Sequence, residues 1–157
     1  MTHLYNQNIY KTRFSSEIMN VLTKYNNIKI EISENKKIVM NVNIQNYNIS
    51  LELDYYYPFT EPIVLIDNDF ISDFYKLPSN RMYQNLADNN LSSNCCFHCS
   101  SIISKRNWSP VRKVVDIIEE INNIINIKKK IYFSILINKI KTKYLIDDIN
   151  IFKYLFN

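Results

Sequence analysis

The stretch IVMNVNIQNYNISLEL, residues 38–53, decides the fold, because apolar residues fall on every second position on both sides of a short polar link. The alternation runs through Ile38–Ile44 and again through Tyr47–Leu53, with mostly Asn, Ser and Glu on the other positions. A period of two is typical of strands with one buried and one solvent-facing side. The link Gln45–Asn46 has the length of a hairpin turn, so the stretch predicts two antiparallel strands.

The same reasoning extends toward both ends of the chain. Ile28–Ile32 alternates in the same way, and Ser33–Lys37 after it is short enough for a second hairpin. Ile63–Ile66 is apolar at every position and predicts a fourth strand. Ahead of the strands we expect a helix over roughly Tyr5–Tyr25, because apolar residues recur there at three- or four-residue steps. These residues are Tyr10, Phe14, Ile18, Leu22 and Tyr25.

Periodicity disappears after the fourth strand, from about Asp67 to Trp108. Loops longer than about 12–15 residues are uncommon in compact domains and are often functional. Ser109-Pro110 then predicts the start of a helix, with a hydroxyl N-cap and proline at the first helical position. The apolar stripe of this helix is expected at Val111, Val114, Val115, Ile118, Ile121 and Ile125. One or two further helices are expected from about Lys129 to the end.

This order of elements predicts an α+β fold. It consists of an N-terminal helix, a four-stranded antiparallel meander, a long loop and C-terminal helices packed on one face of the sheet. The chain has 157 residues, which is the usual size of one domain, so we expect a single domain over residues 1–157.

Composition excludes several classes of function. The chain contains no glycine, so phosphate-binding loops of the GxGxxG and GxxxxGK[ST] types are ruled out. The net charge of +4, from 19 basic and 15 acidic residues, does not indicate a nucleic-acid partner. No stretch approaches the ~20 apolar residues of a membrane span, and Met1–Arg13 has no apolar block of signal type. We therefore expect an intracellular protein that does not enter a membrane.

One cluster contains side chains that could act as metal ligands or nucleophiles: Cys95, Cys96, His98 and Cys99 lie within five residues. A zinc site would usually draw ligands from two separated segments, and His3 is the only other soft candidate. The last two cysteines have the CxxC spacing of a redox pair, but the usual βαβ setting is missing. The remaining interpretations are a single nucleophilic cysteine on a long loop, or three cysteines buried as small apolar residues.

The segments around this cluster resemble the ubiquitin-conjugating (E2) enzyme family. That family has a Tyr-Pro-Phe-x-x-Pro turn after its third strand, and Tyr57–Pro62 reads YPFTEP at the same place. The family also has a cysteine followed by Trp-x-Pro and an aliphatic helix. Here Cys99 lies nine residues before Trp108, which begins the sequence WSP. Upstream, Asn90–Asn94 reads NLSSN, similar to the family's Asn-Ile-x-x-Asn before the cysteine. The resemblance covers roughly Tyr5 to Ile125 and implies the UBC-like fold.

The resemblance implies thioester chemistry without a cofactor. Cys99 would hold ubiquitin or a ubiquitin-like protein as a thioester and pass it to a lysine. Asn90 would donate a hydrogen bond to the oxyanion formed when the lysine attacks. One extra residue between Asn90 and the cysteine leaves Cys96 open as the thiol, although it would lie twelve residues before Trp108. His98 beside Cys99 is interpreted as a bystander.

Partner surfaces also follow from the resemblance, since the first helix and the two motif loops of the family meet other proteins. Lys11 and Arg13 would face the activating enzyme, and Phe59, Pro110 and Val111 would face a ligase. The alternative interpretation is that the basic residues form a solvated helix face and that Phe59 belongs to the core.

Several family features are missing. The glycine-rich hairpin is replaced by Gln45–Asn46, and the His-Pro-Asn tripeptide reads Asp88–Asn90. An alternative function is therefore a catalytically inactive E2-variant or RWD-like module that binds proteins. RWD domains share the Tyr-Pro-x-x-x-Pro turn but lack the Trp-x-Pro helix start, so Trp108–Pro110 favours the E2 interpretation.

Overall fold

The protein is described here by a computed structural model that covers residues 2–33, 35, 37–76 and 97–144. It is an α+β structure with an N-terminal helix, a five-stranded antiparallel sheet and a long C-terminal helix. The chain divides into two compact units, one made of Met1–Lys76 and Cys96–Asn122, the other of Leu77–Cys95 and Asn123–Asn157. Each unit is described by itself.

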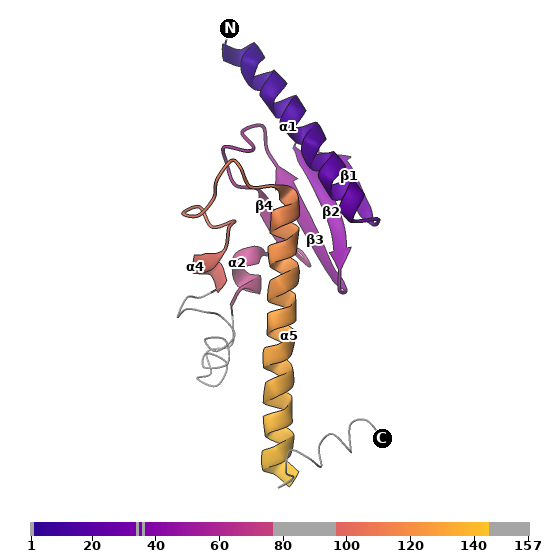
Figure 1. Ribbon diagram of the computed structural model, residues 1–157, viewed down its shortest axis with the longest axis vertical. Helices are drawn as coiled ribbons and strands as arrows, with labels where there is room; N and C mark the ends of the chain where they lie inside the picture. Colours follow the sequence, from indigo (N-terminus) through magenta and orange to yellow (C-terminus); the bar gives the residue numbers. More distant parts are fainter. Residues whose placement is uncertain (1, 34, 36, 77–96, 145–157) are drawn as a thin grey trace. The chain divides into compact units, whose positions relative to one another are not determined.

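The first unit holds the sheet and the segments that flank it. In chain order the elements are α1 (Thr2–Lys24), β1 (Ile28–Ile32), β2 (Ile38–Ile44), β3 (Tyr47–Leu53), β4 (Ile63–Ile66), β5 (Asp69–Phe70), α2 (Ile71–Phe74), α4 (Phe97–Ser100) and α5 (Val114–Tyr144) (Figure 1). The last helix begins in the first unit and ends in the second.

The three strands predicted from the alternation and the fourth predicted from the apolar run are confirmed at the expected bounds, and neighbours in the sequence are neighbours in the sheet. The turn Gln45–Asn46 has φ values of 51° and 74°, as a two-residue hairpin turn of the primed type requires. A fifth strand, β5, was not predicted. It pairs with β4 across Asp67–Asn68, whose φ values are 51° and 72°. An Asp-Asn pair after an apolar run was a usable turn signal.

One face of the sheet is buried, as the alternation predicts. Along β2 and β3, buried residues alternate with more exposed ones, and Met40, Ile49 and Leu51 are almost fully inaccessible to solvent. Asn41 and Ser50, which are opposite each other across the two strands, lie on the other face and are partly exposed. The core of the first unit is therefore built on the face that carries the aliphatic residues.

The buried face of α1 differs from its predicted apolar stripe at Leu22. Leu22 is exposed, whereas Glu17 and Val21 are buried; Phe14 and Ile18 are half-buried. Residues 17 and 21 are one helical turn apart, so they share a face. The apolar stripe did not include Glu17, whose carboxylate is buried because it has hydrogen-bond partners inside the fold.

The helix α5 also differs from its prediction at both ends. It begins at Val114 rather than at Pro110, and it continues without a break to Tyr144 rather than ending near Ile125. The segment before it makes a separate turn, in which the Arg112 N–H donates to the Ser109 carbonyl at 2.9 Å. Val111, expected in the apolar stripe of the helix, is therefore outside it and exposed.

In the second unit, α5 continues to bury one side of its surface. Ile131 and Ile135 are buried and one turn apart, which continues the helical apolar pattern past the basic run at residues 128–130. Lys129 and Lys130 are exposed, whereas Lys128 is half-buried, and this burial lowers its pKa. Within the described ranges, no helix combines the length and apolar character needed to cross a membrane.

The two faces of the sheet should respond differently to truncation. We expect Leu51→Ala to lower the free energy of unfolding by about 2–5 kcal/mol, because it leaves a cavity in a packed core. Asn41→Ala, on the opposite face of the neighbouring strand, should change it by about 0.5 kcal/mol or less. Urea denaturation followed by circular dichroism measures both. Equal losses would mean that both faces are buried.

Candidate functional site

The two motif loops of the sequence lie against each other, although they are far apart in the chain. The indole N–H of Trp108 donates a hydrogen bond of 2.9 Å to the carbonyl of Pro58, and the rings of Trp108 and Tyr57 have centroids 6.1 Å apart. The Tyr57–Pro58 peptide bond is cis. The loop between β3 and β4 and the loop before α5 therefore form one surface (Figure 1).

The first of these loops is held in shape by Asp54. Its carboxylate accepts hydrogen bonds from the Tyr56 N–H at 2.8 Å and from the Thr60 hydroxyl at 2.9 Å. The turn closes with a bond of 2.8 Å from the Phe59 N–H to the Tyr56 carbonyl. The residue Phe59 is 68% exposed, so the alternative interpretation, in which Phe59 belongs to the core, is wrong.

A buried carboxylate, Glu17 of α1, joins the loops to both long helices. Glu17 is 1% exposed. One of its oxygens accepts from the Tyr57 hydroxyl at 2.9 Å and contacts the Arg13 guanidinium at 2.8 Å. The other oxygen accepts from the N–H of Val114, the first residue of α5, at 2.9 Å. A carboxylate at a helix N-terminus is favourable because it meets unpaired N–H groups and the positive end of the helix dipole.

The same contacts explain the state of Tyr57 and the role of Arg13. Burial, followed by the charge of Glu17, raises the pKa of Tyr57, so its hydroxyl remains a hydrogen-bond donor. Arg13 also donates from its guanidinium to the carbonyl of Arg112. Arg13 is therefore part of the fold itself, whereas Lys11, two residues before it, is exposed.

Cys99 lies in the short helix α4 and is exposed. Its backbone is fixed by Asn107, whose side-chain amide donates to the carbonyl of Cys99 at 2.8 Å and to that of Ser101 at 3.0 Å. The Cys99 sulfur is disulfide-bonded in this structure, and the other two cysteines of the chain lie outside the described residues. A disulfide sulfur is not a nucleophile, so Cys99 needs reduction before it can react as a thiolate.

A second carboxylate, Glu120 of α5, holds the segment that follows Cys99. It accepts from the Ile102 N–H at 2.9 Å and from the Tyr75 hydroxyl at 3.0 Å. The oxygen of Tyr75 lies 3.2 Å from the hydroxyl of Ser101, which is buried. Burial and then the charge of Glu120 raise the pKa of Tyr75, which keeps this hydroxyl protonated. The chain is thus anchored to α5 immediately beyond the exposed cysteine.

The remaining predicted site residues have different outcomes. Pro110 and Val111 are exposed, and Val111 reaches 76%. Phe59 is exposed on the other of the two joined loops, and we call these three residues the apolar contact surface. Asn90 lies outside the described residues, so no position is given for the predicted amide. Among the residues that the structure does describe, no group of three His, Cys, Asp or Glu could hold a metal ion.

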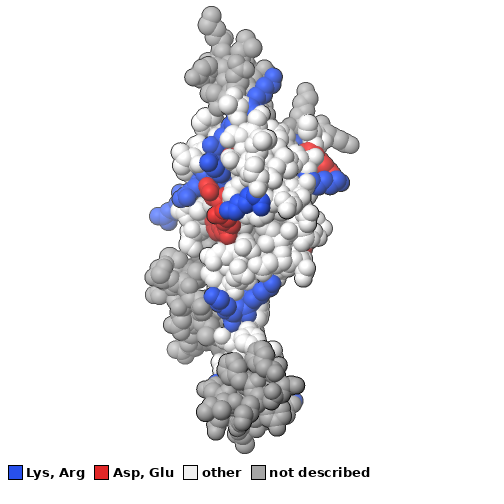
Figure 2. Space-filling model, turned by 45° about the vertical axis from the view of Figure 1, so that its right-hand side comes forward, with Lys and Arg blue, Asp and Glu red and all other residues white. Residues whose placement is uncertain are grey.

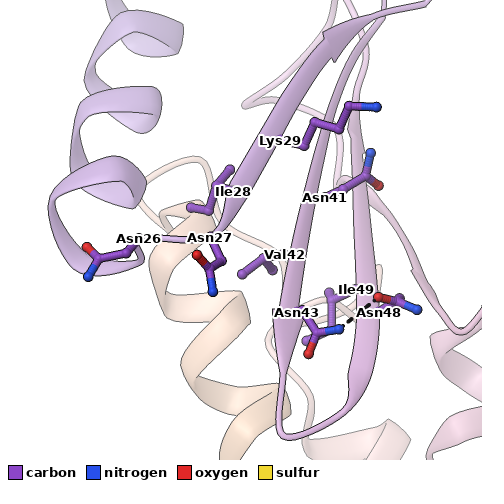
Figure 3. Close-up of a pocket in the computed structure, with 9 residues that line it drawn as sticks. All are labelled: Asn26, Asn27, Ile28, Lys29, Asn41, Val42, Asn43, Asn48 and Ile49. Atoms are coloured by element: carbon purple, nitrogen blue, oxygen red, sulfur yellow. Dashed lines mark hydrogen bonds between the residues drawn. The ribbon is translucent and has the colours of Figure 1, made fainter.

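A separate hollow of about 320 Å³ opens where β1 begins. Figure 3 shows Asn43 and Asn48 turned toward one another beside it, joined by a hydrogen bond of 3.0 Å. Its lining is rich in amides and includes none of the residues of α4 or of the two motif loops. The residues are Asn26, Asn27, Ile28, Lys29, Asn41, Val42, Asn43, Asn48 and Ile49.

Sequence reasoning missed the residues that hold this site together, namely Glu17, Glu120, Tyr75 and Asn107. A signal existed for Glu17, because it lies one turn after Arg13 and one turn before Val21 on the side of the helix that faces the core. Glu120 similarly lies between two buried isoleucines of α5, Ile117 and Ile121. An acidic residue inside an apolar stripe indicates a buried hydrogen-bond acceptor.

No protein-family model, curated protein or solved structure matches this chain. The function is therefore argued from the residues and their geometry. On the face drawn in Figure 2, basic side chains are spread over the surface, and acidic side chains lie beside some of them. Lys24 of α1 and Glu119 of α5 form an ion pair.

The buried and the exposed carboxylate between these two helices should differ in their contribution to stability. We expect Glu17→Ala to lower the free energy of unfolding by about 3–5 kcal/mol, because Arg13, Tyr57 and the first N–H of α5 lose their common partner. Glu119→Ala removes a surface ion pair and should cost about 1 kcal/mol or less. Chemical denaturation measures both variants. A similar loss of unfolding free energy in the two variants would show that Glu17 does not hold the two helices together.

Proposed function

We propose that this chain acts as a ubiquitin-conjugating (E2) enzyme of the UBC-like fold. It would carry ubiquitin or a ubiquitin-like protein as a thioester on Cys99 and pass it to a lysine. The single observation that carries the proposal is the hydrogen bond from Trp108 to Pro58, which joins the two motif loops into one surface. Each loop bears one of the motifs by which the sequence resembles the family.

The reaction needs few groups from the protein. The Cys99 thiolate attacks the carbonyl of the activated ubiquitin terminus, a new C–S bond forms, and the thiolate of the activating enzyme leaves. A lysine amine then attacks the same carbonyl, an amide bond forms, the amine loses a proton, and the Cys99 thiolate leaves. An amide N–H beside the oxyanion lowers the barrier of this step. Asn90 is the residue we propose for this hydrogen bond.

The surroundings of Cys99 suit such a role. The cysteine is exposed, so a large partner can approach it. The segment after it is tied down by Asn107 and by Glu120, whose contacts are to backbone groups. A fixed backbone with an exposed reactive side chain favours a defined approach of the substrate. Asn107 is a positioning residue in this proposal, because it touches the backbone and not the sulfur.

We assign partner surfaces to those predicted residues whose side chains are exposed. Phe59, Pro110 and Val111 form the apolar contact surface, which we assign to a ligase. Large exposed apolar side chains on a rigid turn are typical of protein-binding sites. Lys11 remains available to an activating enzyme, whereas Arg13 is engaged with Glu17 and with the loop before α5.

A second candidate function is a protein-binding module without catalysis. The observation that favours it is the disulfide at Cys99, since an oxidised sulfur cannot form a thioester. The apolar contact surface would then be the functional part of the molecule. Thioester formation by the reduced protein distinguishes the two functions.

We expect the reduced protein, incubated with activating enzyme, ATP and ubiquitin, to form a conjugate that a thiol reagent removes. Cys99→Ser should give a conjugate that survives the reagent, because an oxyester resists thiols. Cys96→Ser should leave the original conjugate in place. Electrophoresis with and without reducing agent reads out each result. A conjugate lost with Cys96→Ala but kept with Cys99→Ala would identify Cys96 as the nucleophile.

The absence of a conjugate from every variant, across several ubiquitin-like proteins, would favour the binding module. Circular dichroism of each variant serves as the control for folding. Cys95→Ser provides the matched substitution, because it changes a neighbouring cysteine that the proposal leaves without a role.

The apolar contact surface should affect transfer and not loading. We expect Phe59→Ala to lower ligase-stimulated discharge of the thioester by about tenfold, since truncating an aromatic anchor commonly costs 1–2 kcal/mol of binding. Phe70→Ala, which truncates another exposed phenylalanine on β5, should leave discharge unchanged. Single-turnover discharge assays measure both. Slower loading of Phe59→Ala would argue against an assignment to the ligase.

A further inference from the structure

The strand β1 forms one edge of the sheet, and no described strand pairs with its outer side. An edge strand presents a row of unpaired N–H and C=O groups, which can pair with another chain. Its sequence is Ile-Lys-Ile-Glu-Ile. The last residue, Ile32, is 76% exposed, which is unusual for a large aliphatic side chain. The edge therefore offers backbone groups with which another strand can pair.

The hydrogen-bond pattern of the first hairpin identifies the backbone groups that face outward. The Ser33 N–H donates to the Lys37 carbonyl at 2.8 Å, and these residues continue the register in which Ile32 is opposite Ile38. In an antiparallel ladder, hydrogen-bonded pairs alternate with non-hydrogen-bonded pairs. Lys29 and Glu31 therefore bond to β2, and the backbone groups of residues 28, 30 and 32 point away from it.

The strand is complementary to itself. Suppose that two copies of β1 lie antiparallel with Ile30 opposite Ile30. Ile28 is then opposite Ile32 of the other copy, and the outward backbone groups of residues 28, 30 and 32 all meet partners. Lys29 is opposite Glu31 of the other copy, and this pairing occurs twice because of the two-fold symmetry. The charges occupy the non-hydrogen-bonded positions, where side chains approach each other most closely.

We propose that two copies of this chain pair through β1, with Ile30 on the two-fold axis, to form a continuous ten-stranded sheet. Within one copy, Lys29 and Glu31 already form an ion pair on the outer face of the sheet. Their neighbours on β2 are Asn41 and Val39, which carry no charge and do not compete for them. In the dimer the four side chains form an alternating cluster of two positive and two negative charges. This inference is independent of the proposed function.

The hollow beside Asn26 and Asn27 lies at the start of the same strand (Figure 3). In the proposed register Asn27 is opposite Ser33 of the other copy, so the end of the partner's strand lies next to this hollow. Of the amides that line it, those of Asn26 and Asn27, which lie just before β1, can then bond to the partner's backbone. Asn27 and the exposed Ile32 are at opposite ends of β1. In the proposed dimer, Asn27 of one copy therefore lies near Ile32 of the other copy.

Charge reversal tests both the surface and its register. We expect sedimentation equilibrium of the reduced full chain to show a concentration-dependent dimer. Lys29→Glu places like charges opposite each other twice, and so does Glu31→Lys. Each variant should raise the dimer Kd by about tenfold or more, since cross-strand charge pairs become repulsive. The double variant, Lys29→Glu with Glu31→Lys, restores both pairs and should dimerise like the original chain.

Mixing the two single variants gives a sharper test. A chain with Glu at positions 29 and 31 complements a chain with Lys at both, so the mixture should form a heterodimer that neither variant forms alone. Lys105→Glu, an equal charge reversal on an exposed loop, is the matched control and should leave the Kd unchanged. Hydrogen exchange should show concentration-dependent protection at the amides of Ile28, Ile30 and Ile32, but not at Lys29 and Glu31.

A monomer at all concentrations up to about 1 mM would overturn the proposal. A dimer whose Kd does not respond to Lys29→Glu would also overturn it, and so would a double variant that fails to recover. Circular dichroism confirms that each variant is folded before its Kd is compared.

Discussion

The rest of the first unit depends on one buried carboxylate, that of Glu17. Three groups converge on it: the Arg13 guanidinium from one turn earlier on α1 and, from distant parts of the chain, the Tyr57 hydroxyl and the first N–H of α5. Burying a charge is costly unless every acceptor site finds a donor. Because Tyr57 and Val114 donate to the same carboxylate, Glu17 fixes the relative positions of α1, the loop after β3 and the start of α5.

The second constraint acts one and a half turns further along α5, where Glu120 accepts from the backbone beyond Cys99 and from Tyr75. The first turns of α5 are thus bonded to Glu17 through Val114 and to the segment after Cys99 through Glu120. A separate hydrogen bond joins Trp108, in the loop before α5, to Pro58. Phe59, Pro110 and Val111 are exposed, but the loops that carry them are held in place by these hydrogen bonds. Such preorganisation reduces the entropy lost when a partner binds.

Two surfaces of different character result from this arrangement. The joined loops offer exposed aromatic and aliphatic side chains, which are suited to a partner with an apolar anchor. The edge strand β1 offers backbone groups and alternating charges, which are suited to a second copy of itself. The two lie on different elements, so engagement at one does not require the residues of the other. A thioester carrier that pairs through its sheet would keep its motif loops available.

The sequence by itself determined β1, β2 and β3, since a period of two and short links are local properties that need no distant contact. The bounds of these strands and the turn at Gln45–Asn46 were predicted on that basis, β4 was predicted from its apolar run, and the two-residue β5 was missed. Tertiary structure decided what local pattern could not: the burial of Glu17, the exposure of Leu22 and Phe59, and the start of α5 at Val114. For Glu17 and for the start of α5, the deciding contacts come from residues far away in the chain. A buried carboxylate is stable only where folding brings its donors together, and a loop side chain is exposed or covered by what packs beside it.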